Sequence, residues 1–298
     1  MTRLAVISDI HGNYMALGAF LEYLRKHPVD GILCLGDYVT DSPYPERTMR
    51  LIYEMRESCP CVMIRGNREE YLLENEKKSQ GWKPSSANGA LYYTALHLSR
   101  EDMAFLEELP REEIFSKEGC PDTYLCHGTP GQIRGNVTFG RGTRERALGA
   151  IEQRYLFGGH SHHQEIFTRG EKTYLNPGSL GLAIDGVGGR AQFALVTGQA
   201  SQGSGSQGGG AKGSTSKDGT WRMELLSIPY DVEGFLRDFQ TSGLEENGRI
   251  LCRAIKKTLV TGINYFYESI LEVQKESPLP LAQIPESVWE TVARRLEL

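Results

Sequence analysis

Carboxylate, imidazole and amide side chains follow five short apolar segments of this 298-residue sequence. Each segment has the length and composition of a buried β-strand. The residues that end these segments are Asp9 with His11, Asp37, Asn67, His127, and His160 with His162. Glycines next to most of them allow sharp backbone turns. Because ligand sites of α/β proteins lie at the carboxyl edge of the sheet, we expect the seven side chains to meet there.

This set combines carboxylate and amide oxygens with imidazole nitrogens and contains no thiolate. Such ligands suit Mn, Fe, Zn or Ni and disfavour Mg²⁺ and Ca²⁺, which prefer oxygen ligands. Two divalent ions together with Asp9 and Asp37 leave a net positive charge, which suits a phosphate anion and a hydroxide. Two metal ions about 3.5–4 Å apart lower the pKa of a shared water and stabilise in-line displacement at phosphorus. We therefore expect two divalent transition-metal ions, with Mn²⁺ favoured, and a small phosphate ester as substrate.

The elements that would position these side chains alternate at first between strand and helix. The apolar spacing predicts them in turn at residues 4–8, 13–27, 31–35, 46–57 and 61–65. Asn13 stands at the expected N-cap of the first helix. This alternation is typical of a parallel sheet with crossover helices. From residue 112 onward, short strands follow one another quickly and predict a second, mostly antiparallel sheet. Two sheets packed face to face with helices outside is the simplest arrangement.

The C-terminal part of the sequence contains no further candidate site residues. Residues 198–219 are rich in Gly, Ser and Gln and predict a flexible loop at the tip of a hairpin. Helices are predicted at residues 230–243, with Asp231 as N-cap, at 247–275 and at 286–298. We expect one domain at residues 1–243 and a helical extension at residues 244–298. The extension could pack on the domain or form a homo-oligomer contact.

Composition excludes several classes of protein. The formal net charge of −5 argues against a strong nucleic-acid-binding surface. No stretch reaches the roughly 18 apolar residues of a membrane span, and Asp9 and His11 interrupt the N-terminal apolar run, which argues against a signal peptide. The six cysteines form no CxxC pair and are typical of buried thiols in the reduced cytoplasm.

The ordered motifs are Asp9-Ile10-His11, Gly36-Asp37, Gly66-Asn67-Arg68-Glu69, His127 and Gly159-His160-Ser161-His162. This set resembles the DxH, GD, GNH(D/E), H and GHxH pattern of the calcineurin-like metallophosphoesterase superfamily, in particular its small bacterial and archaeal phosphodiesterase branch. The resemblance covers roughly residues 1–240. It implies an α/β (α+β) protein with a four-layer α/β/β/α sandwich, followed here by a helical C-terminal tail.

The resemblance also assigns metal ligands. It implies that one metal binds Asp9, His11 and His162, and that the other binds Asn67, His127 and His160. Asp37 would bridge the two ions, and a metal-bridging hydroxide would attack phosphorus. Asp37, Asn67 and Arg68 are accordingly the residues expected to take part in catalysis.

Arg68 departs from the family pattern, which has a His at this position. In many members that His protonates the leaving oxygen or orients the phosphate. Arg cannot donate a proton at neutral pH, because its pKa lies above about 12. Either Arg68 binds a phosphate oxygen of a substrate with an acidic leaving group, or it pairs with Glu69, Glu70 or another acid. Asn13 has a similar pair of interpretations, as a substrate-binding residue or as a helix cap only.

The leading hypothesis is a cytoplasmic, dinuclear metal-dependent phosphoesterase that hydrolyses phosphodiesters. One alternative is a phosphomonoesterase that acts on nucleotides, dinucleoside polyphosphates or phosphoproteins. Another is a metal-binding scaffold of the same fold without catalytic activity. Turnover would separate an enzyme from a scaffold, whereas metal binding alone would not.

Overall fold

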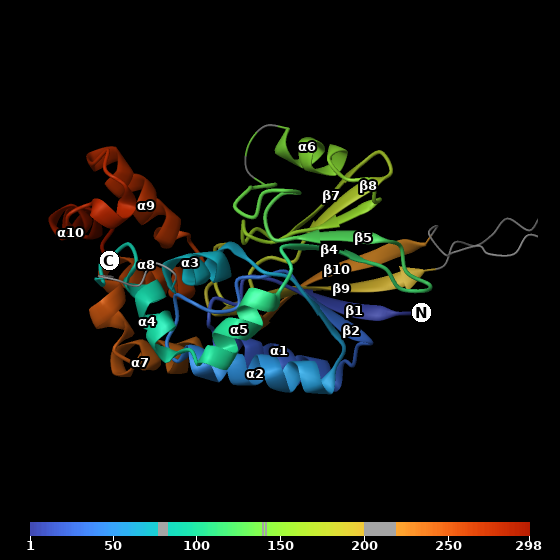
Figure 1. Ribbon diagram of the computed structural model, residues 1–298, viewed down its shortest axis with the longest axis horizontal. Coiled ribbons are helices and arrows are strands. Elements are labelled where there is room, and N and C mark those ends of the chain that lie inside the picture. The colour runs from blue at the N-terminus through green and yellow to red at the C-terminus, as the bar shows by residue number, and fades with distance from the viewer. Residues whose placement is uncertain (77–82, 139, 141, 200–218) are drawn as a thin grey trace, which may run out of the picture.

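The computed structural model describes residues 1–76, 83–138, 140, 142–199 and 219–298. The elements in chain order, most of which are labelled in Figure 1, are β1 (Arg3–Ile7), α1 (Tyr14–Lys26), β2 (Gly31–Cys34), α2 (Pro45–Ser58), β3 (Cys61–Met63), α3 (Asn67–Glu76), α4 (Gly89–His97), α5 (Arg100–Glu108), β4 (Glu112–Phe115), β5 (Thr123–Cys126), α6 (Thr143–Gly149), β6 (Tyr155–Phe157), β7 (Glu165–Arg169), β8 (Lys172–Asn176), β9 (Arg190–Gln199), β10 (Thr220–Pro229), α7 (Val232–Thr241), α8 (Leu244–Thr261), α9 (Tyr265–Glu276), a 3₁₀ turn (Leu281–Gln283) and α10 (Glu286–Arg295).

Two five-stranded sheets form the centre of the fold. The first has the order β10-β9-β1-β2-β3, and the second has the order β4-β5-β6-β8-β7. Strands β1, β2 and β3 are parallel, as the alternation of strand and helix predicts. Strands β5, β6 and β8 are also parallel to one another. The carboxyl ends of β1, β2 and β3 therefore share one edge of the first sheet, and those of β5 and β6 share one edge of the second.

Alternating side chains of β1 show how the sheets and helices are layered. Ala5 and Ile7 pack in a core that includes Phe20 of α1, whereas Leu4 and Val6 face a second core between the two sheets. This follows from the two-residue period of a strand. A third core joins the outer face of the second sheet to α6. Helices thus cover the outer face of each sheet (Figure 1), and the four-layer α/β/β/α arrangement is confirmed.

Two expectations for the second half of the chain are wrong. The second sheet is mixed rather than mostly antiparallel, because two of its four strand pairs are parallel. Strands β9 and β10 belong to the first sheet, where β9 pairs antiparallel with β1. Alternating apolar residues identify a strand but carry no information about its neighbour in space. The hairpin is confirmed, since Gln199 pairs with Thr220, but residues 200–218 of the predicted flexible loop lie outside the described residues.

The predicted long helix at residues 247–275 is divided into α8, whose backbone is non-helical at Arg249, and α9. Gly262 separates them with φ +69°, and a Cβ there would lie 2.3 Å from the backbone nitrogen of Val187. Glycine at this position therefore ends α8 and lets the chain turn. Asp231 caps α7 as expected, by accepting a hydrogen bond from the N–H of Gly234 at 2.8 Å.

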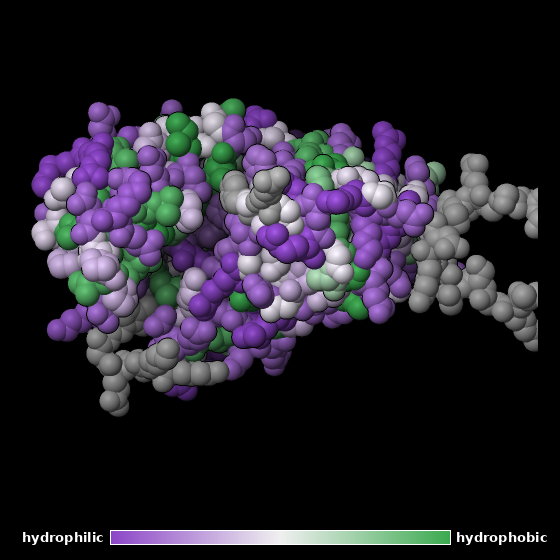
Figure 2. Space-filling view, turned by 90° about the horizontal axis from the view of Figure 1, so that it is seen from above, coloured by the Kyte–Doolittle hydropathy of each residue, from purple (hydrophilic) through white to green (hydrophobic). Residues whose placement is uncertain are grey.

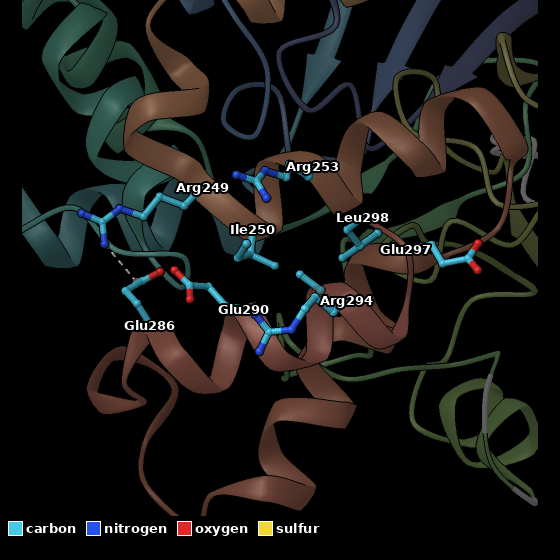
Figure 3. Close-up of a pocket in the computed structure, with 9 residues that line it drawn as sticks. Arg249, Ile250, Arg253, Glu286, Glu290, Arg294, Glu297 and Leu298 are labelled. Carbon is cyan, nitrogen blue, oxygen red and sulfur yellow. Dashed lines mark ion pairs between the residues drawn. The ribbon is translucent and has the colours of Figure 1, made fainter.

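The C-terminal helices pack on the rest of the chain through α4 and on one another around the buried Trp289. Glu286 of α10 accepts hydrogen bonds from the backbone and the hydroxyl of Ser86, at 2.8 and 2.7 Å. It also forms an ion pair with Arg249 of α8, which is dashed in Figure 3. A cavity of about 460 Å³ lies beside this pair, and side chains of α8 and α10 line it. The boundary at residue 243 stays a prediction.

Hydrophilic residues cover most of the face shown in Figure 2, and hydrophobic residues appear there as separate patches. Exposed apolar side chains of α8, α9 and the turn between them include Val260, Ile263, Tyr267 and Leu271. A homo-oligomer contact through these helices stays a prediction. Within the described residues, the structure contains no helix whose length and apolar character would let it cross a membrane.

Candidate metal centre

The loops that follow β1 and β2 are joined by their backbones. Three N–H groups of the first loop donate to three carbonyl oxygens of the second at 2.9 or 3.0 Å: Asp9 to Gly36, His11 to Asp37, and Gly12 to Tyr38. Parallel neighbouring strands deliver both loops to the same edge. The candidate ligands Asp9, His11 and Asp37 are thereby placed together before any metal ion is considered.

Glu69 connects these loops to the start of α3. Its buried carboxylate accepts hydrogen bonds from the backbone N–H groups of Asp37 and Gly66, each at 2.9 Å, and of Tyr38 at 2.8 Å. Burial, together with the nearby charge of Asp37, raises the pKa of Glu69 to about 7. Glu69 therefore holds the loop after β2 against the backbone that directly precedes Asn67.

Two groups of candidate ligands lie side by side. One ligand atom each from Asp9, His11 and His162 lie within 4.8 Å of one another. One atom each from Asp37, His127 and His160 form a second group of the same kind. We call these the Asp9 cluster and the Asp37 cluster.

Asp37 lies between the two clusters. Its Oδ2 is 3.3 Å from Nε2 of His127 and 3.7 Å from Nε2 of His11, so it faces an imidazole from each cluster. Oδ1 of Asn67 is 3.0 Å from the same nitrogen of His127. The structure therefore brings together all seven side chains that the sequence proposes as ligands.

Three of the imidazoles have an oxygen atom of the protein as the partner of Nδ1. Nδ1 of His127 donates to the carbonyl oxygen of Leu35 at 2.7 Å, and Nδ1 of His162 donates to that of Leu182 at 2.8 Å. Nδ1 of His11 lies 3.0 Å from a carboxylate oxygen of Asp41. Because carbonyl and ionised carboxylate oxygens only accept, each Nδ1 must hold a proton, and Nε2 is the nitrogen that each ring turns toward the site. Second partners of this kind are typical of metal-binding histidines.

Asp9 provides a test of whether metal ions fit this arrangement. Its Oδ1 is buried and has no hydrogen-bond partner among the described residues. The nearest imidazole nitrogens are Nε2 of His162 at 3.3 Å, of His11 at 3.7 Å and of His127 at 3.9 Å. A buried carboxylate oxygen without a partner costs free energy unless a cation compensates it. The donor set therefore fits two divalent metal ions, one for each cluster.

Electrostatics in the site favour cations. Burial alone would lower the pKa of His11, but Asp41 and Asp9 raise it to about 10. Burial alone would likewise lower the pKa of His127, but Asp37 and Asp9 raise it to about 9. The carboxylates attract protons to the imidazoles, and metal ions would displace those protons.

The ligand-bearing loops also have an uncommon backbone conformation. The angle φ is positive, between 48° and 65°, at Asp9, His11, Asp37, His160 and His162. A left-handed conformation at a residue other than glycine is uncommon, and a strained backbone costs about 1–3 kcal/mol at each position. Such residues cluster at functional sites, where the surrounding structure holds them in place.

Comparison with known proteins identifies the family. A model of the calcineurin-like phosphoesterase superfamily domain matches residues 2–200. This chain belongs to that superfamily.

Its relatives include proteins from archaea and bacteria. An uncharacterized protein of Methanocaldococcus jannaschii is 27% identical over 206 residues, which cover 62% of this chain and 79% of the relative. A symmetrical bis(5'-nucleosyl)-tetraphosphatase of Pseudomonas syringae pv. tomato is 35% identical over 75 residues, which cover 25% of this chain and 24% of the relative.

Solved structures share the fold. A metallophosphoesterase of Sphaerobacter thermophilus is 22% identical with a TM-score of 0.63. A hypothetical protein of Pyrococcus horikoshii is 20% identical with a TM-score of 0.69. Each match covers 88% of this chain and 99% of the solved chain. At these identities the likeness concerns the fold.

Arg68 and Asn13 make contacts within the protein. Nε of Arg68 donates to Asp41 at 2.7 Å, and the side chain of Arg68 is 16% exposed. The acid that pairs with Arg68 is thus neither of the two glutamates considered from the sequence.

The side-chain amide of Asn13 accepts a hydrogen bond from the N–H of Ala16 at 2.9 Å and donates one to the carbonyl of Gly181 at 2.8 Å. The first contact is that of a helix cap, the second joins the start of α1 to the turn after β8, and the side chain is fully buried.

Sequence reasoning missed two carboxylates, Asp41 and Glu69. Glu69 belongs to the Gly66-Asn67-Arg68-Glu69 motif, which was a signal that it lies near the site. Its hydrogen bonds to the N–H groups of Asp37 and Tyr38 could not be predicted, because only the folded chain brings these residues together. Asp41 follows Thr40 in a loop without periodicity, and no signal in the sequence connects it to His11.

Proposed function

We propose that this chain is a dinuclear metal-dependent phosphodiesterase, in which Asp9, His11 and His162 bind one metal ion and Asn67, His127 and His160 bind the other. Asp37 would be shared by both ions. The proposal rests on the position of Asp37 Oδ2, which lies within 3.7 Å of Nε2 of His11 in one cluster and of His127 in the other. Two ions bound there would lower the pKa of a shared water and withdraw charge from the phosphate.

The charge of the site supports a diester as substrate. Two divalent ions bring four positive charges, and Asp9 and Asp37 return two. A hydroxide and a singly charged phosphodiester would together neutralise the remaining two charges. A phosphomonoester dianion would leave one negative charge uncompensated. Arg68 adds no compensation, because Asp41 already neutralises it.

The contacts of Arg68 also bear on the leaving group. The superfamily's usual His is absent at this position, and a guanidinium does not donate its proton at neutral pH. We therefore expect the chain to prefer esters whose leaving oxygen is stable without protonation. Model diesters with acidic phenols meet this requirement.

The test is hydrolysis of bis-p-nitrophenyl phosphate and of p-nitrophenyl phosphate with added Mn²⁺. We compare the parent with Asp37→Ala, and we use Asp30→Ala as the control. Asp30 is exposed and lies before β2, at the opposite end of this strand from Asp37. We expect the parent and the control to cleave the diester faster than the monoester, and Asp37→Ala to lose turnover.

Other outcomes would replace the proposal. Faster cleavage of the monoester would favour a phosphomonoesterase. Bound metal without turnover of either ester would favour the scaffold. The local likeness to a symmetrical bis(5'-nucleosyl)-tetraphosphatase makes a dinucleoside tetraphosphate the first natural compound to test.

A further inference from the structure

The guanidinium of Arg68 is held by one carboxylate oxygen. Both Nε and Nη2 donate to Oδ2 of Asp41. The backbone N–H of Arg68 donates to Oδ1 of Asp37 at 2.8 Å, which fixes the start of this side chain at the metal centre. Because Asp41 is 3% exposed, a movement of Arg68 toward a phosphate would leave a buried carboxylate without its main partner.

Asp41 contacts His11 as well as Arg68. The same Oδ2 that binds Arg68 lies 3.0 Å from Nδ1 of His11 and accepts from the hydroxyl of Thr40 at 2.9 Å. This oxygen sets the direction of the His11 ring and hence of Nε2, which faces the two carboxylates of the centre. The rings of His127 and His162 have backbone partners instead, so His11 alone of these three depends on a side chain.

The C-terminal helices reach the same guanidinium. The Cζ atom of Arg68 lies 5.5 Å from the ring centroid of Phe266, at the start of α9. Phe266 packs against two apolar cores of the C-terminal helices, which include Leu259 and Trp289. A cation that faces an aromatic ring at this distance is stabilised in its orientation. Phe266 thus connects the helical tail to the centre through Arg68.

We propose that Arg68 is a positioning residue that holds Asp41 against His11, and that Phe266 of the C-terminal helices keeps Arg68 in this orientation. The inference rests on the proposed metal-dependent function. It gives Arg68 a role different from that of a phosphate-binding residue. It also means that the C-terminal helices, through Phe266, help to orient the His11 ring of the metal centre.

The first experiment measures Mn²⁺ affinity by calorimetry on the chelator-treated full-length chain, independently of turnover. We compare the parent, Arg68→Ala and Arg56→Ala. Arg56 is a matched control, because its guanidinium faces Phe105 at 4.7 Å on an exposed part of α2. We expect Arg68→Ala to lower the affinity of one ion about 10- to 100-fold, as changes behind a metal-binding His do, and Arg56→Ala to leave it unchanged.

Kinetics with bis-p-nitrophenyl phosphate separate positioning from substrate binding. We expect Arg68→Ala to lower kcat at limiting Mn²⁺ and to change KM less than about threefold, with recovery of kcat at saturating Mn²⁺. An unchanged Mn²⁺ affinity together with a strongly raised KM would overturn the proposal and make Arg68 a substrate-binding residue. If the parent binds Mn²⁺ but cleaves no ester, the affinity data still decide the role of Arg68 while the proposed function fails.

A double-mutant cycle tests whether Arg68 acts through Asp41. We expect Arg68→Ala to cost affinity in the parent and little in Asp41→Asn, because the two residues share one path to His11. Equal losses of Mn²⁺ affinity in the parent and in Asp41→Asn would show that Arg68 does not act through Asp41. Circular dichroism establishes that each variant is folded.

Phe266→Leu tests the tail without removing its apolar packing. We expect a loss of Mn²⁺ affinity of roughly two- to fivefold, the size of an exposed cation–π contact. Tyr267→Leu is the control, because the neighbouring Tyr267 is 55% exposed. Equal affinities for Phe266→Leu and the parent would overturn the contribution of the tail.

Discussion

The His11 ring of the Asp9 cluster and the His127 ring of the Asp37 cluster, both in the candidate metal centre, are supported in different ways. In the Asp37 cluster, the ring of His127 is oriented by the carbonyl of Leu35, directly after β2. In the Asp9 cluster, the ring of His11 is oriented by the side chain of Asp41, which in turn binds Arg68. A carbonyl at the end of a strand moves only if the sheet moves, whereas a carboxylate can be replaced by a single substitution. Of the three imidazoles with an oxygen partner at Nδ1, His11 of the Asp9 cluster is therefore the one whose support a single substitution can remove, since His162 of the same cluster has the backbone carbonyl of Leu182 as its partner.

The two clusters also share parts. His160 and His162 lie two residues apart in one turn but belong to different clusters. The backbone N–H of His160 donates to Oδ2 of Asp9 at 3.0 Å, so the turn that carries one ligand also holds a ligand of the other cluster. The clusters can thus be compared by single substitutions on the same short loop.

The largest expected effect comes from removing one ligand from each cluster. His160→Ala and His162→Ala should each lower turnover on the order of 10³-fold, because a catalytic metal ion contributes several kcal/mol to transition-state stabilisation. Elemental analysis should find two metal ions per chain in the parent and fewer in each variant. His97→Ala, on α4, serves as control. A variant that keeps both ions and full turnover would contradict the assignment of its cluster.

A smaller effect should follow from crowding the backbone of the Asp37 cluster. A Cβ at Gly66 would lie 2.2 Å from Oδ1 and 2.3 Å from the backbone nitrogen of Asp37. Gly66→Ala should therefore lower the free energy of unfolding by about 1–3 kcal/mol, measured by urea denaturation. Gly149→Ala is the matched control, because no neighbouring atom lies within 4 Å of a Cβ there. Equal losses for both variants would show that the Asp37 loop is not rigid.

The smallest effect concerns the pH dependence of the chelator-treated protein. The raised pKa values of His11, about 10, and His127, about 9, add stability that is fully present below their ordinary pKa of about 6.5. This stability is lost as the pH rises through 9 for His127 and through 10 for His11. The melting temperature should fall between pH 7 and pH 10, and by less in His11→Ala. A parent whose melting temperature rises over this range would contradict the charge balance of the centre.

Sequence patterns located the strands after which the candidate ligands stand. Apolar runs of strand length located β1, β2, β3, β5 and β6, and parallel strands bring such ends together. Patterns failed for the placement of β9, since an alternating strand fits next to several neighbours. They also failed for residues 247–275, where helical spacing continues across the glycine that separates α8 from α9.

The sequence by itself determined which side chains are candidate metal ligands and which strands they follow, because strand periodicity and turn residues can be recognised within short segments. Only the tertiary structure decided what supports those ligands. Asp41 lies 30 residues from His11 and 27 from Arg68, and Phe266 lies far beyond both. Contacts between residues so distant in the chain depend on how loops and helices pack. The partner of Arg68 and the link to the C-terminal helices therefore became visible only in the folded chain.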